Sequence, residues 1–204
     1  MPHRLMFSAL LCGLFAAFPG GGAEIGDGLR GAAEYRVVTA DFRQLRRLKE
    51  LGMELTIRGS MASERNGRLR WQVDSPTRSV TLIGKETLRH FDRETGKTAV
   101  IRKESFPWLK IMGDAMNDWL TGDPERLARR FKVSRPSPDT LLLAPTDPGL
   151  LQFCRSVELS FSSDRRELRK IRIDEPSGDE LEINFFNVKH DPPLPPDFWR
   201  MPPE

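Results

Sequence analysis

The sequence predicts a mainly β protein with a few helices, built on an antiparallel sheet that curls into a barrel or partial barrel. Two observations predict this fold. Apolar residues recur at every second position in nine or ten short segments, which is the period of a half-buried strand. Gly, Asn, Asp, Ser and Pro gather between these segments, as they do in the turns of sequential hairpins.

The first 23 residues have the pattern of a cleaved export signal. Residues 1–4 give a short positive start, residues 5–18 an apolar stretch, and residues 19–23 a run of small residues. Neither this stretch nor any later segment reaches the roughly 20 apolar residues of a membrane span. We expect cleavage after Ala23 and a soluble mature chain of one domain, residues 24–204, since a chain of this length buries roughly 70% of its surface around one core.

Charge and cysteine content exclude several classes of protein. The formal charge is +3, and removing residues 1–23, which hold one Arg and no acidic residue, lowers it to +2. Charged residues of both signs are mixed along the chain, so no basic stripe for nucleic acid is present. Cys154 is the only cysteine outside the signal, so no internal disulfide is possible. Cys12 follows Ala9-Leu10-Leu11, which lacks the small residue expected beside a lipidated cysteine.

Helical signals are few. We expect a first helix over residues 28–38 and a second over residues 113–121. Asp123-Pro124-Glu125 has the capping side chain and the first-turn proline of a third helix, which would lead into residues 126–131. Residues 41–51 fit either class, because three leucines have helical spacing whereas the position before a run of hairpins favours a strand.

Residues 53–74 form the clearest hairpin. Apolar and polar residues alternate in both arms, and the arms flank Asn66-Gly67, a turn dipeptide whose two residues tolerate positive φ. We expect the second arm to end at Pro76. The other expected strands cover residues 80–83, 88–91, 98–102, 140–144, 156–161, 168–173 and 181–188.

The proline-rich tail, residues 191–204, cannot continue the sheet, since proline supplies no hydrogen-bond donor to a ladder. We expect an extended strap.

No catalytic set is recognisable. His90 and His190 lack sequence neighbours that would complete a triad, and the pair His90 and Asp92 falls short of the four ligands of a structural metal site. The acidic residues between 174 and 180 lack the spacing of a calcium loop, and no Gly-rich phosphate loop is present. We expect neither an enzyme nor a bound cofactor or metal, and we interpret Cys154 as a half-buried small apolar residue.

The strand period places many apolar residues on one face of the sheet. This face either fills an ordinary core or lines a cavity for an apolar ligand. The set comprises Met53, Leu55, Ile57, Leu69, Trp71, Val73, Val80, Leu82, Leu159, Phe161, Leu181, Ile183 and Phe185.

The order of several motifs resembles the LolA family of periplasmic lipoprotein carriers. Phe42-x-Gln44 comes first, Arg65 lies six positions before Trp71, and Trp71-x-x-x-x-Pro76 is followed by Val80-Thr81-Leu82-Ile83. Later agreement includes Leu141-Leu142-Leu143-Ala144-Pro145, Val157-Glu158-Leu159-Ser160-Phe161, Ile171-x-Ile173, Asn187-Val188 and Pro195-x-x-Phe198. Asn66-Gly67 stands where the family commonly has a proline after the Arg, so the chain resembles divergent members of the family.

The resemblance implies an incomplete antiparallel β-barrel, or half-barrel, whose mouth is covered by a helical lid. It implies a periplasmic carrier, a monomer, that holds the acyl chains of a lipoprotein or other acylated lipid and moves them from an inner-membrane ABC-type release complex to an outer-membrane acceptor. A non-transporting envelope sensor or scaffold on the same half-barrel is the alternative. On this interpretation residues 42–51 continue the sheet as a strand, Trp71 faces inward, and Arg68 and Arg70 face water or a partner.

The same resemblance assigns site residues. Arg65, Met116 and Trp119 would form the lid or gate, with Arg65 tying the barrel to its lid. The lipid-binding cavity would be lined by Leu55, Ile57, Leu69, Trp71, Val73, Leu82, Leu159, Phe161, Leu181, Ile183 and Phe185.

Overall fold

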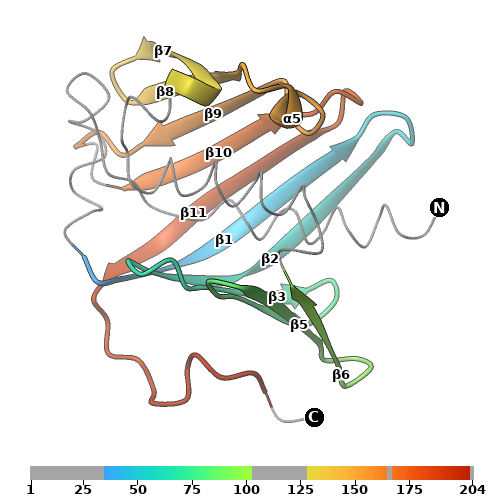
Figure 1. Ribbon diagram of the computed structural model, residues 1–204, viewed down its shortest axis with the longest axis vertical. Helices are drawn as coiled ribbons and strands as arrows, with labels where there is room; N and C mark the ends of the chain where they lie inside the picture. The colour runs from blue at the N-terminus through green and yellow to red at the C-terminus, as the bar shows by residue number, and fades with distance from the viewer. Residues whose placement is uncertain (1–34, 103–127, 165–166, 203–204) are drawn as a thin grey trace.

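The described part of the chain forms a single open antiparallel sheet of eleven strands (Figure 1). The computed structural model describes residues 35–102, 128–164 and 167–202. The strands are β1 (Val37–Leu48), β2 (Met53–Glu64), β3 (Leu69–Ser75), β4 (Ser79–Ile83), β5 (Thr87–Asp92), β6 (Lys97–Arg102), β7 (Phe131–Ser137), β8 (Thr140–Pro145), β9 (Ser156–Phe161), β10 (Leu168–Asp174) and β11 (Glu180–His190). The prediction of a mainly β protein on an antiparallel sheet is confirmed.

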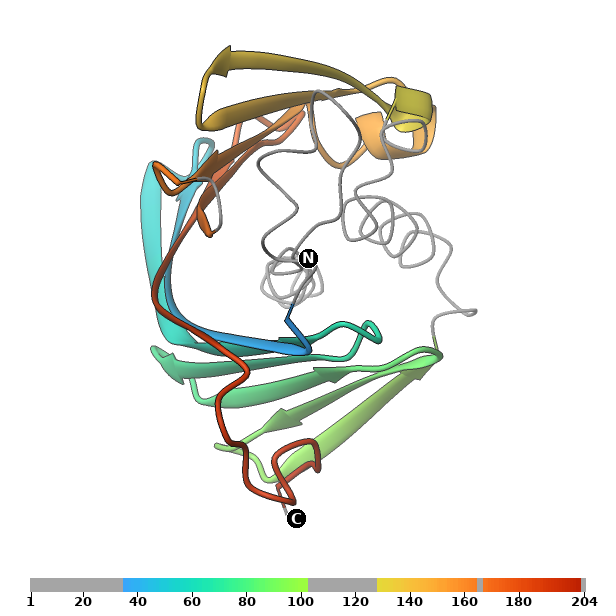
Figure 2. The same ribbon diagram turned by 90° about the vertical axis from the view of Figure 1, so that its left-hand side faces the viewer.

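Strand β1 lies at the centre of the sheet. The order is β6-β5-β4-β3-β2-β1-β11-β10-β9-β8-β7, so the first six strands lie on one side of the junction between β1 and β11 and the last five on the other. Each half is a run of sequential hairpins, as the turn signals predict. Figure 2 shows the sheet curved into a C-shaped section, with a concave inner face and a convex outer face.

The segment that fitted either class is a strand over most of its length, because β1 runs to Leu48 and a turn follows. Buried residues alternate with more exposed ones along β1, and the inward residues pair with inward residues of β2. Gln44 lies opposite Ile57, and Arg46 lies opposite Leu55. The leucine spacing that suggested a helix was misleading, since pairing to β2 on one side and to β11 on the other fixes the extended backbone.

The Asn66-Gly67 hairpin is confirmed, but its turn uses positive φ at Gly67 and not at Asn66. The amide of Gly67 donates to the carbonyl of Glu64 at 2.8 Å, and the amide of Glu64 donates to the carbonyl of Arg68 at 2.8 Å. Asn66 instead accepts from the amide of Arg68 through Oδ1 at 3.0 Å. Strand β3 then ends at Ser75, immediately before Pro76.

Three helix predictions have different outcomes. The expected helix over 28–38 is wrong over residues 35–38, because none of these is helical and Val37 begins β1. Its residues 28–34 lie outside the described part, as does the expected helix over 113–121. Residues 128–130 are helical as predicted, but Phe131 begins β7. The alternation does not reveal this strand, because it contains Pro136 and few apolar residues. The short helix α5 (Pro148–Leu151) starts with Asp147 as its cap, whose Oδ1 accepts from the amide of Gly149 at 2.7 Å.

The proline-rich tail is extended over residues 192–195 as predicted, whereas residues 196–199 form a turn in which the amide of Phe198 donates to the carbonyl of Pro195 at 3.0 Å. We call residues 191–202 the strap, and it runs along the convex face of the sheet (Figure 2). Asp191 fixes its start, since Oδ1 accepts from the amides of Arg36 at 2.9 Å and Val37 at 2.8 Å. In the described part of the chain, no helix has the length and hydropathy of a membrane span.

Candidate functional site

The concave face of the sheet is the candidate site. The strap identifies the two faces of β3. It contacts Arg70 on the convex face, and Trp71, the next residue along the strand, therefore points to the concave face. Trp71 stacks on Phe42 of β1 with ring centroids 3.8 Å apart and an interplanar angle of 24°. The register places Met61 of β2 and Thr81 of β4 on either side of Trp71. Trp71 therefore lies between Met61 and Thr81 and covers the ring of Phe42 on the concave side.

The structure brings the predicted cavity residues together, with one exception. Ile57, Leu69, Trp71, Leu159, Phe161, Leu181, Ile183 and Phe185 belong to one buried cluster, and Leu55 and Val73 pack against it. Leu82 is the exception, because it lies opposite Arg70 in the register and therefore on the convex face with its neighbour Val80. Thr81 and Ile83 of β4 take the inward positions instead.

The position of Trp71 within an Arg-rich strand follows from these two faces. Arg70 turns outward and donates from Nη1 to the carbonyl of Phe198 at 2.9 Å, with its guanidinium 5.1 Å from the ring centre of Phe198. Arg68 lies 4.8 Å from the ring centre of Trp199. Burial beneath the strap lowers the pKa of Arg70. The arginines hold the strap, and Trp71 faces the concave side.

Two polar side chains interrupt the apolar surface at its centre. Gln44 is only 1% exposed, and neither Oε1 nor Nε2 has a hydrogen-bond partner. Arg46, two residues further on the same face, binds Glu175 through Nη2 at 2.8 Å and lies 3.7 Å from Asp179. Its Nε and Nη1 atoms are buried without partners. Burial raises the pKa of Glu175, and Arg46 opposes this rise by stabilising the carboxylate.

Sequence reasoning noticed Gln44 only as part of Phe42-x-Gln44 and missed Arg46. A signal was present, because both residues continue the inward set of β1 that begins with Val38, Ala40 and Phe42. Alternation of apolar residues alone does not reveal them, because both side chains are polar.

His90 also lies on the concave face, in register with Thr81. Its Nδ1 atom is 2.9 Å from the hydroxyl of Thr81, and burial lowers the pKa of its ring. His90 is therefore predominantly neutral at pH 7 and adds no charge to the apolar surface.

The nucleophile and metal-ligand candidates among the described residues are Cys154 and the His, Cys, Asp and Glu side chains. Burial raises the pKa of Cys154 from its ordinary 9.0 to about 11, so the thiol remains protonated, and its Sγ lies 3.7 Å from the carbonyl of Leu150. Among residues 35–102, 128–164 and 167–202, no three His, Cys, Asp or Glu side chains gather as metal ligands would.

The three predicted gate residues are not seen together. Arg65 lies in the turn between β2 and β3, and its Nε donates to the carbonyl of Tyr35 at 3.3 Å. Tyr35 in turn stacks on His190 at the end of β11, with ring centroids 3.8 Å apart. Met116 and Trp119 lie outside the described residues. The predicted tie between Arg65 and a lid remains a prediction.

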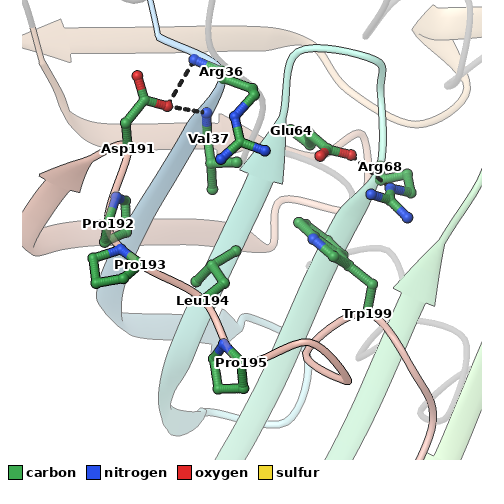
Figure 3. A pocket seen from close by; sticks show the side chains of 10 residues that line it. All are labelled: Arg36, Val37, Glu64, Arg68, Asp191, Pro192, Pro193, Leu194, Pro195 and Trp199. Atoms are coloured by element: carbon green, nitrogen blue, oxygen red, sulfur yellow. Dashed lines mark hydrogen bonds and ion pairs between the residues drawn. The ribbon is translucent and has the colours of Figure 1, made fainter.

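A hollow of about 530 Å³ lies on the convex side of the sheet, between the strap and the ends of β1 to β3 (Figure 3). Arg36, Glu64, Arg68 and Asp191 contribute charged side chains to it, and Leu194 and Trp199 contribute apolar ones. Arg68 donates to Glu64 at 2.6 Å, and this bond holds the pKa of Glu64 below its usual value. With four charged groups on its wall, this hollow is poorly suited to hydrocarbon.

The chain matches the family described as "Outer membrane lipoprotein carrier protein LolA" over residues 33–201. No curated protein matches it. A solved structure of a DUF1329 family protein from Desulfovibrio piger is similar, with 10% identity, a TM-score of 0.52, and coverage of 87% of this chain and 95% of that one. A MucA/MucB complex from Pseudomonas aeruginosa shows 15% identity, a TM-score of 0.51, and coverage of 88% and 62%. A LolA superfamily protein from Nitrosomonas europaea shows 12% identity, a TM-score of 0.42, and coverage of 85% and 96%.

Proposed function

Because this chain belongs to the outer membrane lipoprotein carrier protein LolA family, we propose that it binds the acyl chains of a lipoprotein, or of another acylated lipid, on the concave face and carries them from the inner towards the outer membrane. The observation that carries the proposal is the apolar surface that extends from β3 across β2, β1 and β11 to β9, with Trp71 stacked on Phe42, and that is interrupted on β1 by Gln44 and Arg46.

Binding on this surface requires no covalent step. Each methylene that leaves water contributes about 0.8 kcal/mol, so one long acyl chain contributes on the order of 10 kcal/mol before ordering costs. A sheet offers an extended apolar surface to such a chain without specific contacts along it. The bound chain must be shielded from water during transport and exposed again for release. The family resemblance gives this role to a lid that opens and closes.

We place Arg65, Met116 and Trp119 in this gate. For Arg65 the support is its position in the turn beside Tyr35, at the end of the sheet where β1 begins. The donor would be an inner-membrane ABC-type release complex and the acceptor an outer-membrane protein. The carrier would act as a periplasmic monomer, exported through the cleaved signal of residues 1–23.

A second candidate is a non-transporting envelope sensor or scaffold. The likeness to MucB, which was solved in complex with MucA, favours it, because that protein has the same fold and binds a partner protein. The chain spans 62% of that solved chain, and at 15% identity the likeness concerns the fold alone. A sensor could hold an acyl chain on the same face without passing it on.

Transfer separates the two candidates. The mature protein is incubated with inner-membrane vesicles loaded with a fluorescent triacylated lipoprotein, and soluble protein is then separated and mixed with outer-membrane vesicles. A carrier removes the lipoprotein into the soluble fraction and delivers it to the second membrane. Binding without delivery supports the sensor, and the absence of any soluble complex contradicts both.

A further inference from the structure

The most unusual feature of the concave face is the pair formed by Gln44 and Arg46, which we call the polar pair. In the described part of the chain, five buried side-chain nitrogen or oxygen atoms lack a hydrogen-bond partner, and four of them belong to these two residues. Buried polar atoms are normally paired, and each exception requires an explanation. Because the unpaired atoms gather at one place, a missing partner explains them better than four independent defects.

The polar pair lies on β1, the middle strand of the sheet (Figure 1), with Arg46 towards the end of the strand that faces the turn between β10 and β11. Gln44 is flanked across the strands by Ile57 and Ile183, and Arg46 by Leu55 and Leu181. All four flanking residues belong to the apolar cluster or pack against it. A ligand group that reaches the pair must therefore be polar itself while the rest of the ligand covers apolar surface on both sides.

The free atoms define the chemistry of that group. Gln44 offers one acceptor and one N–H₂ donor, which together complement the C=O and N–H of an amide. Arg46 offers N–H groups at Nε and Nη1, which suit a carbonyl oxygen. A carboxylate is a poorer fit, since Glu175 and Asp179 already face the same guanidinium and would repel a third negative charge.

We propose that the polar pair binds the neutral amide or ester group at the head of an acyl chain, with Gln44 exchanging two hydrogen bonds with an N-acyl amide and Arg46 donating to a neighbouring carbonyl. The inference rests on the proposed function, because it takes an acyl chain as the ligand of the concave face. The pair would set where the head of the chain lies, so that its hydrocarbon extends over the isoleucine and leucine side chains on either side. Acylated cargo would thereby be distinguished from plain hydrocarbon.

The test compares two probes that differ in the polar head. N-myristoylglycinamide carries an amide, whereas tetradecane has none, and each displaces the fluorescent dye N-phenyl-1-naphthylamine from the full mature protein. The variant Gln44→Met keeps the length of the side chain and removes both polar atoms. We expect it to bind N-myristoylglycinamide about tenfold more weakly, to bind tetradecane at least as well, and to melt no lower than the wild type.

Leu45→Met, next to Gln44 but on the opposite face of β1, is the matched control and should leave the affinities for both probes unchanged. Arg46→Lys keeps the positive charge beside Glu175 but removes the guanidinium fork, and it should also weaken the amide probe selectively. If Gln44→Met leaves the ratio of the two affinities unchanged, the polar pair does not bind the amide head, and the proposed function is unaffected. A wild-type protein that binds neither probe overturns the proposed function and the inference with it.

Discussion

At the scale of single residues, Trp71 is the most informative position on the concave face. It is 2% exposed and stacks on Phe42, so it supports the fold as well as the proposed ligand surface. We expect Trp71→Ala to lower the free energy of unfolding by about 3–5 kcal/mol and to weaken capture of an acylated probe. Urea denaturation and dye displacement measure the two effects.

Trp199→Ala is the matched control, since Trp199 belongs to the strap on the convex face. It should leave capture unchanged. If a folded Trp71→Ala variant captured the probe as well as the wild type, Trp71 would be removed from the ligand surface.

The thiol of Cys154 predicts a particular dependence of stability on pH. Its pKa rises from the ordinary 9.0 to about 11 on folding, so the folded protein binds more protons than the unfolded chain between these values. This contribution to stability is complete below about pH 9 and is lost as the pH rises towards 11. Relative to Cys154→Ala, the wild type should lose about 1–2 kcal/mol between pH 8 and pH 10.5. A parallel pH dependence of the two proteins in urea denaturation would refute the prediction.

At the scale of elements, Gly59 shows why β2 and β3 can pair as they do. The register shifts between Arg58 and Gly59, and a Cβ atom at Gly59 would collide with the carbonyl oxygen of Gln72 and lie 2.9 Å from Cζ of Phe42. We expect Gly59→Ala to lower the free energy of unfolding by about 3 kcal/mol, because backbone and core must both move. Gly84→Ala is the control, since its Cβ would lie an ordinary 3.6 Å from its nearest neighbour. Equal melting temperatures for the two variants would contradict this account.

The elements also show how far the sequence could lead. Strands with regular alternation, such as β2, β3 and β9, are predicted well because one periodic signal determines both the extended backbone and the buried face. The signal fails in β4. The alternation predicts that Val80 and Leu82 face inward, whereas both lie on the convex face and Val80 is fully buried there. Val80 pairs with Phe91 of β5, which is buried as well, so both faces of β4 carry buried side chains and the pattern alone cannot distinguish them.

At the scale of the whole molecule, the meeting of β1 with β11 brings the two halves of the chain together. Hairpins follow from local turn chemistry, but this pairing joins residues more than 130 positions apart, such as Arg43 and Asn184. Local pattern carries no information on such a contact. The polar pair was missed for a related reason: whether Gln44 and Arg46 have partners depends on the packing around both residues, which the sequence pattern does not report.

The central claim is that acyl chains occupy the concave face, and photo-crosslinking measures this most directly. A lipopeptide with a diazirine in its palmitoyl chain is bound to the mature protein, illuminated, and the modified residues are identified by mass spectrometry. The account predicts modification of concave-face residues such as Phe42, Trp71 and Ile183. Modification confined to the convex face, at Val80, Phe91 or Trp199, would contradict it.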